Sequence, residues 1–260
     1  MYRKGPASQA RAAELFGTAT DAGHAVATAW FASFYWFGFG VEQSEAEGGR
    51  LAGIALDERG LQSLADQGDT WAQHALGSMY FNGMGVAEDA CEAVVWWRKS
   101  AEQKYAEAQF DLAFAYREGA GVDMDKGKAL EWIRKAAEQG HAVAQCALAN
   151  AYRYGEGVDK SLDEAAGWFR KSAEQGVVDA QFSLGQAYQD GAGVVKNECK
   201  AVHWFRKAAE QGDEEAQRVI DEWATALADV AAGWQVINDP DPRATVVDAD
   251  VPRRLEARRY

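Results

Sequence analysis

The chain has 260 residues, a formal net charge of −13 at pH 7 and an isoelectric point near 4.8. This acidic balance argues against a nucleic-acid partner, because binding a phosphate backbone requires a clustered positive field. The three cysteines, Cys91, Cys146 and Cys199, are too few for a disulfide framework, and we expect free thiols. All four prolines lie outside residues 7–239, which suits a body that is helical throughout.

A pattern with a period of 36 residues runs through the middle of the chain. An alanine–glutamine pair returns at each step, four residues after a glycine in every copy but one. The pairs are Ala72–Gln73, Ala108–Gln109, Ala144–Gln145, Ala180–Gln181 and Ala216–Gln217. A period between about 20 and 50 residues indicates stacked supersecondary units, none of which can bury its apolar face alone.

Each unit is predicted to be a pair of helices. The first, helix A, is exemplified by residues 142–154, where Ala144, Leu148 and Tyr152 lie four residues apart on one face. It ends at a Gly-x-Gly-Val loop, whose glycines allow the left-handed backbone of a tight reversal. The second, helix B, follows a capping residue and carries an alanine and then a tryptophan that we expect to fill the core. The caps are Asp89, Asp125, Ser161 and Asn197, and the tryptophans are Trp96, Trp132, Trp168 and Trp204.

These signals predict an all-α fold, a superhelical α/α solenoid of antiparallel helix pairs with 36-residue repeats. Residues 1–7 are an N-terminal extension, residues 8–232 the solenoid and residues 233–260 a flexible tail. Within the solenoid, 8–22 is a lone helix B, 23–67 an enlarged divergent repeat, 68–211 the clear repeats and 212–232 a polar capping helix. In the enlarged repeat, Ser44 and Glu47 can form a capping box, and nine extra residues lengthen or split helix B.

No group of residues has the spacing of a catalytic or metal site. The chain has no His-Glu-x-x-His or Cys-x-x-Cys motif, and its four histidines are isolated or recur with the units. We therefore expect no catalytic residue, no metal and no cofactor. Arg–Lys pairs recur on helix B, but a glutamate four residues after each arginine can neutralise it locally. The pairs are Arg98–Lys99, Arg134–Lys135, Arg170–Lys171 and Arg206–Lys207, and the glutamates are Glu102, Glu138, Glu174 and Glu210.

Helix A has a second face that varies between units while the core face barely changes. This pattern is expected if the core residues maintain the fold while the variable face is adapted to a partner. Aromatic and arginine side chains are common interface anchors. The candidate protein-binding residues on this face are Trp71, His74, Phe81, Phe110, Phe114, Arg117, Asn150, Arg153, Tyr154, Phe182, Gln186 and Gln189. Two alternatives are open for Phe110 and Phe182, which either line this surface or pack between adjacent A helices.

Seven aromatic residues fall within residues 30–39, more than a repeat core needs. Three interpretations are open: packing beneath the insertion, a hydrophobic docking surface that includes Trp36 and Phe37, or membrane insertion. The uncharged run over residues 22–41 and its charged flanks would suit a spanning helix. The run is barely long enough, contains Gly38 and Gly40, and aligns with an ordinary unit, so membrane contact is the least favoured of the three.

The repeated motif is Ala-x-Ala-Gln-x-x-Leu-x-x-x-Tyr-x-x-Gly-x-Gly-Val, followed by Ala-x-x-Trp-x-Arg-Lys-x-Ala-Glu-Gln-Gly. It resembles the Sel-one-like repeat (SLR) family, a relative of the tetratricopeptide repeat, over residues 68–211, with Lys104 in place of one glycine. The resemblance implies a right-handed superhelix whose variable helix A face lines a concave groove, in a protein interaction scaffold or adaptor. Some cysteine-rich bacterial relatives are associated with penicillin binding and β-lactamase activity, but their paired cysteines are absent here.

The expected function is therefore a non-enzymatic scaffold or adaptor that binds a segment or domain of another protein on its concave helix A surface. One alternative is a structural subunit of a larger, membrane-associated assembly, docked through the aromatic residues 30–39. A further alternative is a β-lactam-binding hydrolase. Because the N-terminal residues contain no apolar signal-peptide core, we expect a cytoplasmic location, with organelle targeting by residues 1–13 as the alternative.

Overall fold

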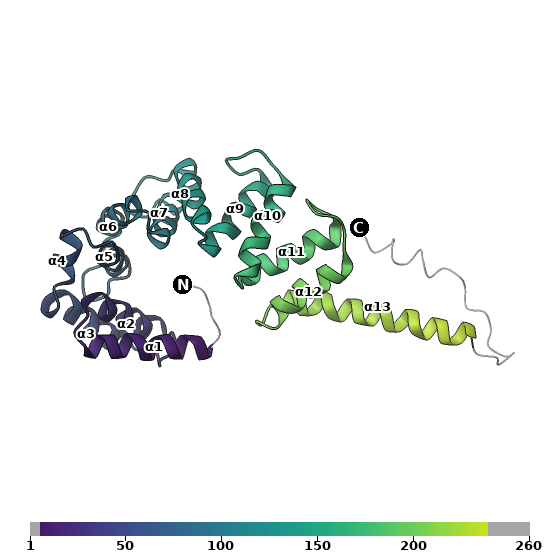
Figure 1. Ribbon diagram of the computed structural model, residues 1–260, viewed down its shortest axis with the longest axis horizontal. Coiled ribbons are helices and arrows are strands. Elements are labelled where there is room, and N and C mark those ends of the chain that lie inside the picture. The colour runs from purple at the N-terminus through teal and green to yellow at the C-terminus, as the bar shows by residue number, and fades with distance from the viewer. Residues whose placement is uncertain (1–5, 239–260) are drawn as a thin grey trace.

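The computed structural model describes residues 6–238 and contains helices and turns but no strand within that range (Figure 1). The helices follow one another in pairs along an open arc, with α1 at one end and α13 at the other. Each packs mainly against its neighbours in sequence, as in a repeat array, which confirms the predicted all-α solenoid. The elements are α1 (Pro6–Asp21), α2 (Ala25–Phe37), α3 (Glu45–Gly53), the π-helical turn η1 (Ile54–Glu58), α4 (Leu61–Asp66), α5 (Thr70–Asn82), α6 (Ala90–Glu102), α7 (Ala106–Glu118), α8 (Lys126–Glu138), α9 (Ala142–Tyr154), α10 (Leu162–Glu174), α11 (Val178–Asp190), α12 (Glu198–Ala209) and α13 (Glu214–Asn238).

The predicted caps begin helices α6, α8, α10 and α12. The side chains of Asp89, Asp125, Ser161 and Asn197 each accept a hydrogen bond from the backbone N–H three residues later. Each bond satisfies a donor that would otherwise be unpaired and contributes about 1 kcal/mol. The A helices α5, α7, α9 and α11 each end on the first loop glycine, whose φ values of 67°, 71°, 75° and 74° lie in the left-handed region.

The second loop glycine is required by a close approach between neighbouring units. A Cβ atom on Gly121 would lie 2.1 Å from the carbonyl oxygen of Ala90, at the start of α6. A Cβ atom on Gly193 would lie 2.0 Å from the carbonyl oxygen of Leu162, at the start of α10. Each loop therefore rests directly on the first turn of the preceding B helix, a contact that has no room for a side chain.

The tryptophans of helix B do not all fill the core, which corrects the sequence prediction. Trp96 is buried, whereas the other three are half-buried. The lysine of each Arg–Lys pair lies over the tryptophan of its own helix, with the ammonium nitrogen 3.5, 3.8, 3.7 and 4.9 Å from the ring centroids along the array. The next residue along the helix is the enclosed one: Trp97, Phe169 and Phe205 are buried, and Ile133 takes this position in α8.

The recurring glutamines join successive units by hydrogen bonds. Gln145 of α9 donates to the carbonyl of Ala137 at the end of α8, at 3.2 Å, and accepts from Gln175 at the end of α10, at 2.8 Å. The pairs Gln73–Gln103, Gln109–Gln139 and Gln181–Gln211 repeat the second bond. The alanine–glutamine signal in the sequence therefore marks a structural contact, and it points to no ligand.

The enlarged repeat contains a split B helix. Ser44 caps α3 by accepting from the Glu47 N–H, which is one half of the predicted capping box, whereas the Glu47 carboxylate accepts from Arg50 and the Ser44 N–H donates to the Tyr35 carbonyl. The helix then passes through η1, breaks at Gly60 with φ 69°, and resumes as α4. Arg59 at the break donates to the Thr28 hydroxyl at 2.8 Å and to the Thr20 carbonyl, which ties the insertion to α2 and α1.

Both ends of the described array differ slightly from the sequence boundaries. Helix α1 begins at Pro6, before the predicted Ser8, and α13 continues beyond residue 232 to Asn238, into the predicted tail. The rest of that tail, residues 239–260, lies outside the described residues, as do residues 1–5 of the predicted extension. Between residues 6 and 238, none of the helices has the length and apolar character that a membrane crossing requires.

Candidate protein-binding site

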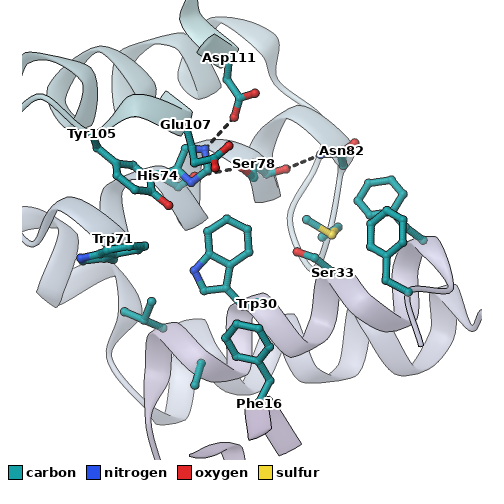
Figure 2. A pocket seen from close by; sticks show the side chains of 15 residues that line it. Phe16, Trp30, Ser33, Trp71, His74, Ser78, Asn82, Tyr105, Glu107 and Asp111 are labelled. Carbon is teal, nitrogen blue, oxygen red and sulfur yellow. Dashed lines mark hydrogen bonds and ion pairs between the residues drawn. The ribbon is translucent and has the colours of Figure 1, made fainter. Parts of the chain in front are cut away.

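Successive A helices enclose a groove at the N-terminal end of the array (Figure 2). This N-terminal groove has a volume of about 570 Å³. Helices α1 and α2 form one side, and α5 with the start of α7 forms the other. The lining residues are Phe16, Val26, Ala27, Trp30, Ser33, Phe37, Phe39, Trp71, His74, Ser78, Asn82, Met84, Tyr105, Glu107 and Asp111.

Aromatic rings form the walls and rim of the N-terminal groove. Trp71 and Phe37 are 53% and 43% exposed, although both lie on regular helices. Trp71 packs on Tyr105 with ring centroids 4.5 Å apart, and Trp30 lies 5.3 Å from the ring of His74. These contacts fix the rings in place, so the groove is formed before any partner arrives.

Two carboxylates on the first turns of α7 supply the charge of the groove. Asp111 Oδ2 lies 2.7 Å from His74 Nε2, and Glu107 Oε2 lies 2.9 Å from His141 Nε2. Nδ1 of His141 accepts the N–H of Ala144 at 3.0 Å and so caps α9. That bond assigns the proton of a neutral His141 ring to Nε2, which donates to Glu107. Both histidines are buried, whereas the Glu107 and Asp111 side chains are 43% and 35% exposed.

The groove is electrostatically negative. Burial alone would raise the pKa of Glu107, but the hydrogen bond to His141 and the charges around it outweigh burial and hold the pKa below its usual value. Burial, reinforced by Glu107 and Asp111, raises the pKa of Tyr105, which keeps its hydroxyl protonated. None of the lining residues is a lysine or an arginine. The aromatic walls therefore face an anionic edge with no lysine or arginine to balance it.

A second groove, which we call the middle groove, lies between α7, α8, α9 and the start of α11. It has a volume of about 700 Å³. Its apolar floor includes Leu130 and Ile133, and its charged residues are of both signs: Arg117 and Lys126 against Glu156 and Asp179. The predicted residues Phe110, Arg117 and Asn150 line it together with Cys146.

A third hollow, the narrow hollow, occupies the same position one repeat later and measures about 50 Å³. Two predicted residues, Arg153 and Gln186, line it and are joined by a hydrogen bond of 3.3 Å. Tyr154 and Phe114, 61% and 37% exposed, stand outside these three spaces with a neighbouring arginine over each ring. Half-buried Gln189 lines none of the three.

Several predicted surface residues belong to the internal packing. Phe182 packs on the buried ring of Phe205, and Phe81 packs on Trp97, with centroids 5.4 and 5.0 Å apart. Phe110 stacks on the His141 ring at 4.7 Å while still reaching the middle groove. The ring of His74 is 3% exposed, so this histidine acts through Asp111 and offers little surface of its own.

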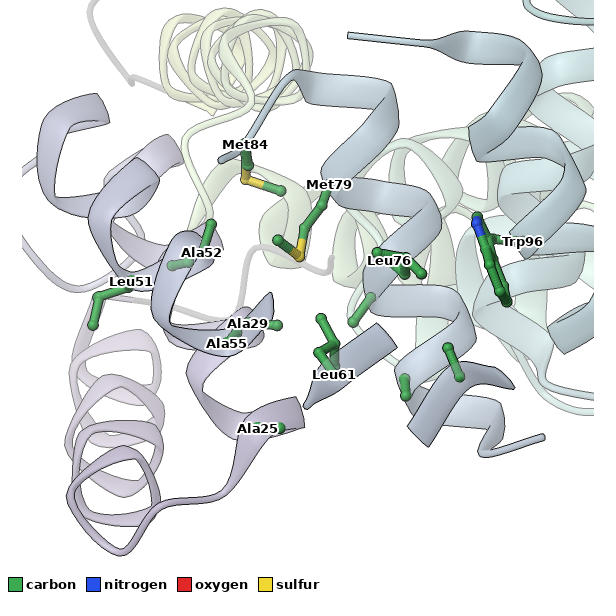
Figure 3. Packing of buried hydrophobic residues seen from close by; sticks show 14 residues of the cluster. Ala25, Ala29, Leu51, Ala52, Ala55, Leu61, Leu76, Met79, Met84 and Trp96 are labelled. Atoms are coloured by element: carbon green, nitrogen blue, oxygen red, sulfur yellow. The ribbon is translucent and has the colours of Figure 1, made fainter. Parts of the chain in front are cut away.

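The aromatic run over residues 30–39 is mainly internal, as in the first of its three interpretations, packing beneath the insertion. Trp36, a predicted binding residue, packs against the buried cluster in Figure 3 and lies beside Gly48 of α3. Phe34 is buried, and Phe31 and Tyr35 pack on the same cluster. Trp30, Phe37 and Phe39 are the members of the run that reach the N-terminal groove.

The candidate residues chosen from the sequence did not include Trp30, Tyr105, Glu107 or Asp111, although Trp30 belongs to the aromatic run over residues 30–39. A signal existed for Asp111, because the equivalent helix A positions hold Ala75, Ala147 and Ser183. A carboxylate at a position otherwise occupied by small residues indicates a local role. Trp30 could not be selected from the sequence, because neither the composition nor the 36-residue period shows which aromatic rings of residues 30–39 face the groove and which pack inward.

The Arg–Lys pairs of the B helices contact aromatic side chains rather than the glutamates that the sequence predicted. Besides the lysines over tryptophan rings, Arg98 and Arg170 donate to the hydroxyls of Tyr116 and Tyr188 at 3.0 and 3.1 Å. Over residues 6–238, the ion pairs do not include the predicted arginine–glutamate pairs. The same range holds no group of three or more histidine, cysteine, aspartate or glutamate side chains that could hold a metal ion.

Solved structures with related sequences share the fold. The chain is 34% identical to a protective antigen of uropathogenic Escherichia coli that displays an SLR fold, with a TM-score of 0.60, and it is 30% identical to a Sel1 repeat protein from Oxalobacter formigenes, with a TM-score of 0.61. The matches cover 79% and 77% of this chain but 42% and 66% of those chains, so the chain spans less than two thirds of either.

A more distant structure, an immunity protein from Pseudomonas aeruginosa, is 19% identical with a TM-score of 0.53 over 76% of this chain and 72% of that chain, and shows the fold alone. No curated protein matches the chain. The Sel1 repeat pattern matches residues 72–105, 106–141, 142–177 and 178–213 in succession. These four repeats cover more than half of the sequence, and the chain therefore belongs to the Sel1 repeat family.

Proposed function

We propose that this protein is a non-enzymatic scaffold that holds a segment of a partner protein in its N-terminal groove. Proteins of the Sel1 repeat family generally act as protein–protein interaction scaffolds. The observation that carries the assignment to this groove is the exposure of Trp71 and Phe37 on opposite sides of a space of about 570 Å³. Large apolar side chains held exposed on rigid helices are typical of interaction sites.

The rigidity of the groove supports the same proposal. Trp71 rests on Tyr105, and Trp30 rests on His74, which is itself buried and bonded to Asp111. A partner segment therefore meets rings that are already ordered, and the loss of conformational entropy falls mainly on the partner. Aromatic anchors in such preformed pockets commonly contribute about 2 kcal/mol or more each to binding.

A double variant tests the proposal. Phe37→Ala with Trp71→Ala removes the two exposed rings, while Met124→Ala with Val195→Ala removes two exposed apolar side chains from loops outside the groove. The tagged full-length chain and both variants would be used to recover partners from the native cell, after circular dichroism has shown equal helix content. We expect a partner that is recovered with the parent chain and the loop variant but lost from the groove variant. Identical partners for all three would refute the groove as the binding site.

A further inference from the structure

We propose that the N-terminal groove selects partner segments that carry an arginine side chain, which enters between the aromatic walls and the carboxylates of Glu107 and Asp111. This inference rests on the proposed function and adds the chemistry of the partner to it. It is drawn from charge complementarity, because two carboxylates line the groove and no lysine or arginine does.

The two carboxylates are positioned as a pair. Glu107 and Asp111 are four residues apart on α7, and residues with that spacing lie on the same helix face. Each is held through one oxygen by a buried imidazole, at 2.9 and 2.7 Å. The other oxygens, Oε1 of Glu107 and Oδ1 of Asp111, accept no hydrogen bond from the described part of the chain. The imidazoles therefore orient the carboxylates and leave one acceptor oxygen on each.

The hydrogen-bond geometry constrains the second ring nitrogen, Nδ1, of both histidines. His141 uses Nδ1 as an acceptor for the α9 cap, so a proton on that nitrogen would break the cap. His74 Nδ1 is buried without a hydrogen-bond partner, so a proton there would be an unsatisfied buried donor. Both rings therefore act as donors through Nε2, and the two carboxylates are the acceptors.

The aromatic walls favour a guanidinium over other cations. Trp71, Tyr105 and Trp30 line the same groove as the two carboxylates (Figure 2). A planar guanidinium can stack on such rings and at the same time donate two parallel hydrogen bonds to a carboxylate. An ammonium group is a point charge and cannot do both equally well. The chain already places cations over tryptophan rings four times on its B helices, but there the cations are its own lysines.

The middle groove provides an internal contrast. It is larger, but Arg117 and Lys126 line it together with Glu156 and Asp179, so its positive and negative residues are equal in number. A cationic side chain of a partner is therefore attracted less strongly to the middle groove than to the N-terminal groove. The selection for arginine is therefore expected at the N-terminal groove and not at the middle groove.

A displayed library of random dodecapeptides, panned against the full-length protein, tests this inference. The groove variant is Glu107→Gln with Asp111→Asn, because both amides can still accept from the histidines while losing their charge. The control, Glu102→Gln with Glu138→Gln on the exposed surface of the B helices, makes the same change in net charge. We expect arginine enrichment with the parent chain and the control, and none with the groove variant.

The selected peptides would then be measured by fluorescence anisotropy. Replacing their arginine by lysine should weaken binding several-fold, replacing it by glutamine at least tenfold, and raising the salt concentration should weaken it further. Selected peptides that lack arginine but still require Trp71 would overturn this inference and leave the proposed function standing. Arginine peptides that bind the groove variant unchanged would also overturn it. If no peptide is selected at all, both proposals fail.

Discussion

The middle groove and the narrow hollow occupy the same position in successive repeats, yet their volumes are about 700 and 50 Å³. Most of the residues around them correspond when the sequence is shifted by 36 positions. Arg117 corresponds to Arg153, Ala129 to Ala165 and Ala151 to Ala187. The backbone framework is thus the same, and the difference arises from side chains.

Three substitutions between the repeats distinguish the two spaces. Ile133 in the middle groove is replaced by the buried ring of Phe169 in the narrow hollow. Asn150 is replaced by Gln186, which reaches Arg153 and closes the space with a hydrogen bond. Cys146 lines the middle groove, whereas its counterpart Phe182 turns to pack on Phe205. A solenoid can therefore open or close a groove at any junction by changing a few side chains and leaving the helices in place.

The largest expected effect is a loss of stability when the Phe169 side chain, which fills the narrow hollow, is removed. Phe169→Ala should lower the free energy of unfolding by about 3–5 kcal/mol, because Phe169 is 2% exposed and its ring would leave a cavity. Ile133→Ala should cost less than half as much, since Ile133 already borders an open space. Urea unfolding followed by circular dichroism measures both. Equal losses for the two variants would show that the repeats are packed alike and would break the comparison.

The thiol that lines the middle groove should be unreactive. Burial, followed by the Asp179 carboxylate, raises the pKa of Cys146 to about 12, whereas Cys91 and Cys199 are exposed. Because the thiolate is the reactive form, alkylation of Cys146 at pH 8 should be about a hundredfold slower than that of the exposed thiols. Mass spectrometry of peptides after timed iodoacetamide treatment would measure the three rates. A Cys146 rate equal to the others would mean that the groove opens readily to solvent.

Filling the middle groove should stabilise the protein modestly. Ile133→Phe places at this junction the ring that Phe169 supplies one repeat later, and filling such a space commonly contributes about 0.5–2 kcal/mol. We expect a rise of a few degrees in the melting temperature. Met124→Phe adds a similar ring at a position that is 65% exposed and serves as the control. A fall in melting temperature for Ile133→Phe alone would show that the groove has no room for the ring.

The smallest expected effect is a loss of the stability contributed by Glu107 at acidic pH. The pKa of Glu107 in the folded protein lies below its ordinary value of 4.5, so its stabilising contribution is complete above pH 4.5 and is lost as the pH falls through the folded pKa. The stability difference between the parent chain and Glu107→Gln should therefore shrink between pH 5 and pH 3, values chosen to bracket that range. The effect is small because the side chain is 43% exposed and solvent screens it.

Thermal melts at a series of pH values would measure this effect, with Glu102→Gln as a charge-matched control on α6. A difference that stays constant with pH would mean that the bond between Glu107 and His141 contributes no stability. This result would also contradict the view that His141 holds Glu107 in place. The N-terminal groove would then differ less from the middle groove, whose charges are of both signs.

The sequence predicted the parts of the structure that depend on short-range contacts. The caps at Asp89, Asp125, Ser161 and Asn197, the loop glycines and the 36-residue period all recur locally, so each copy supports the assignment of the others. The candidate site was predicted less well. Trp71, Phe37, Arg117, Asn150, Arg153 and Gln186 do line grooves, whereas Trp36, Phe81 and Phe182 pack inward.

The sequence by itself thus determined the helices, their caps and turns and the stacking of the repeats, because the responsible signals lie within one unit. Only the tertiary structure decided which faces enclose a groove. Trp30 on α2 and Asp111 on α7 line the same N-terminal groove, and no local pattern links them. Whether Ile133 leaves a space that Phe169 fills depends on side-chain volume at a junction between units, which the period of the sequence does not report.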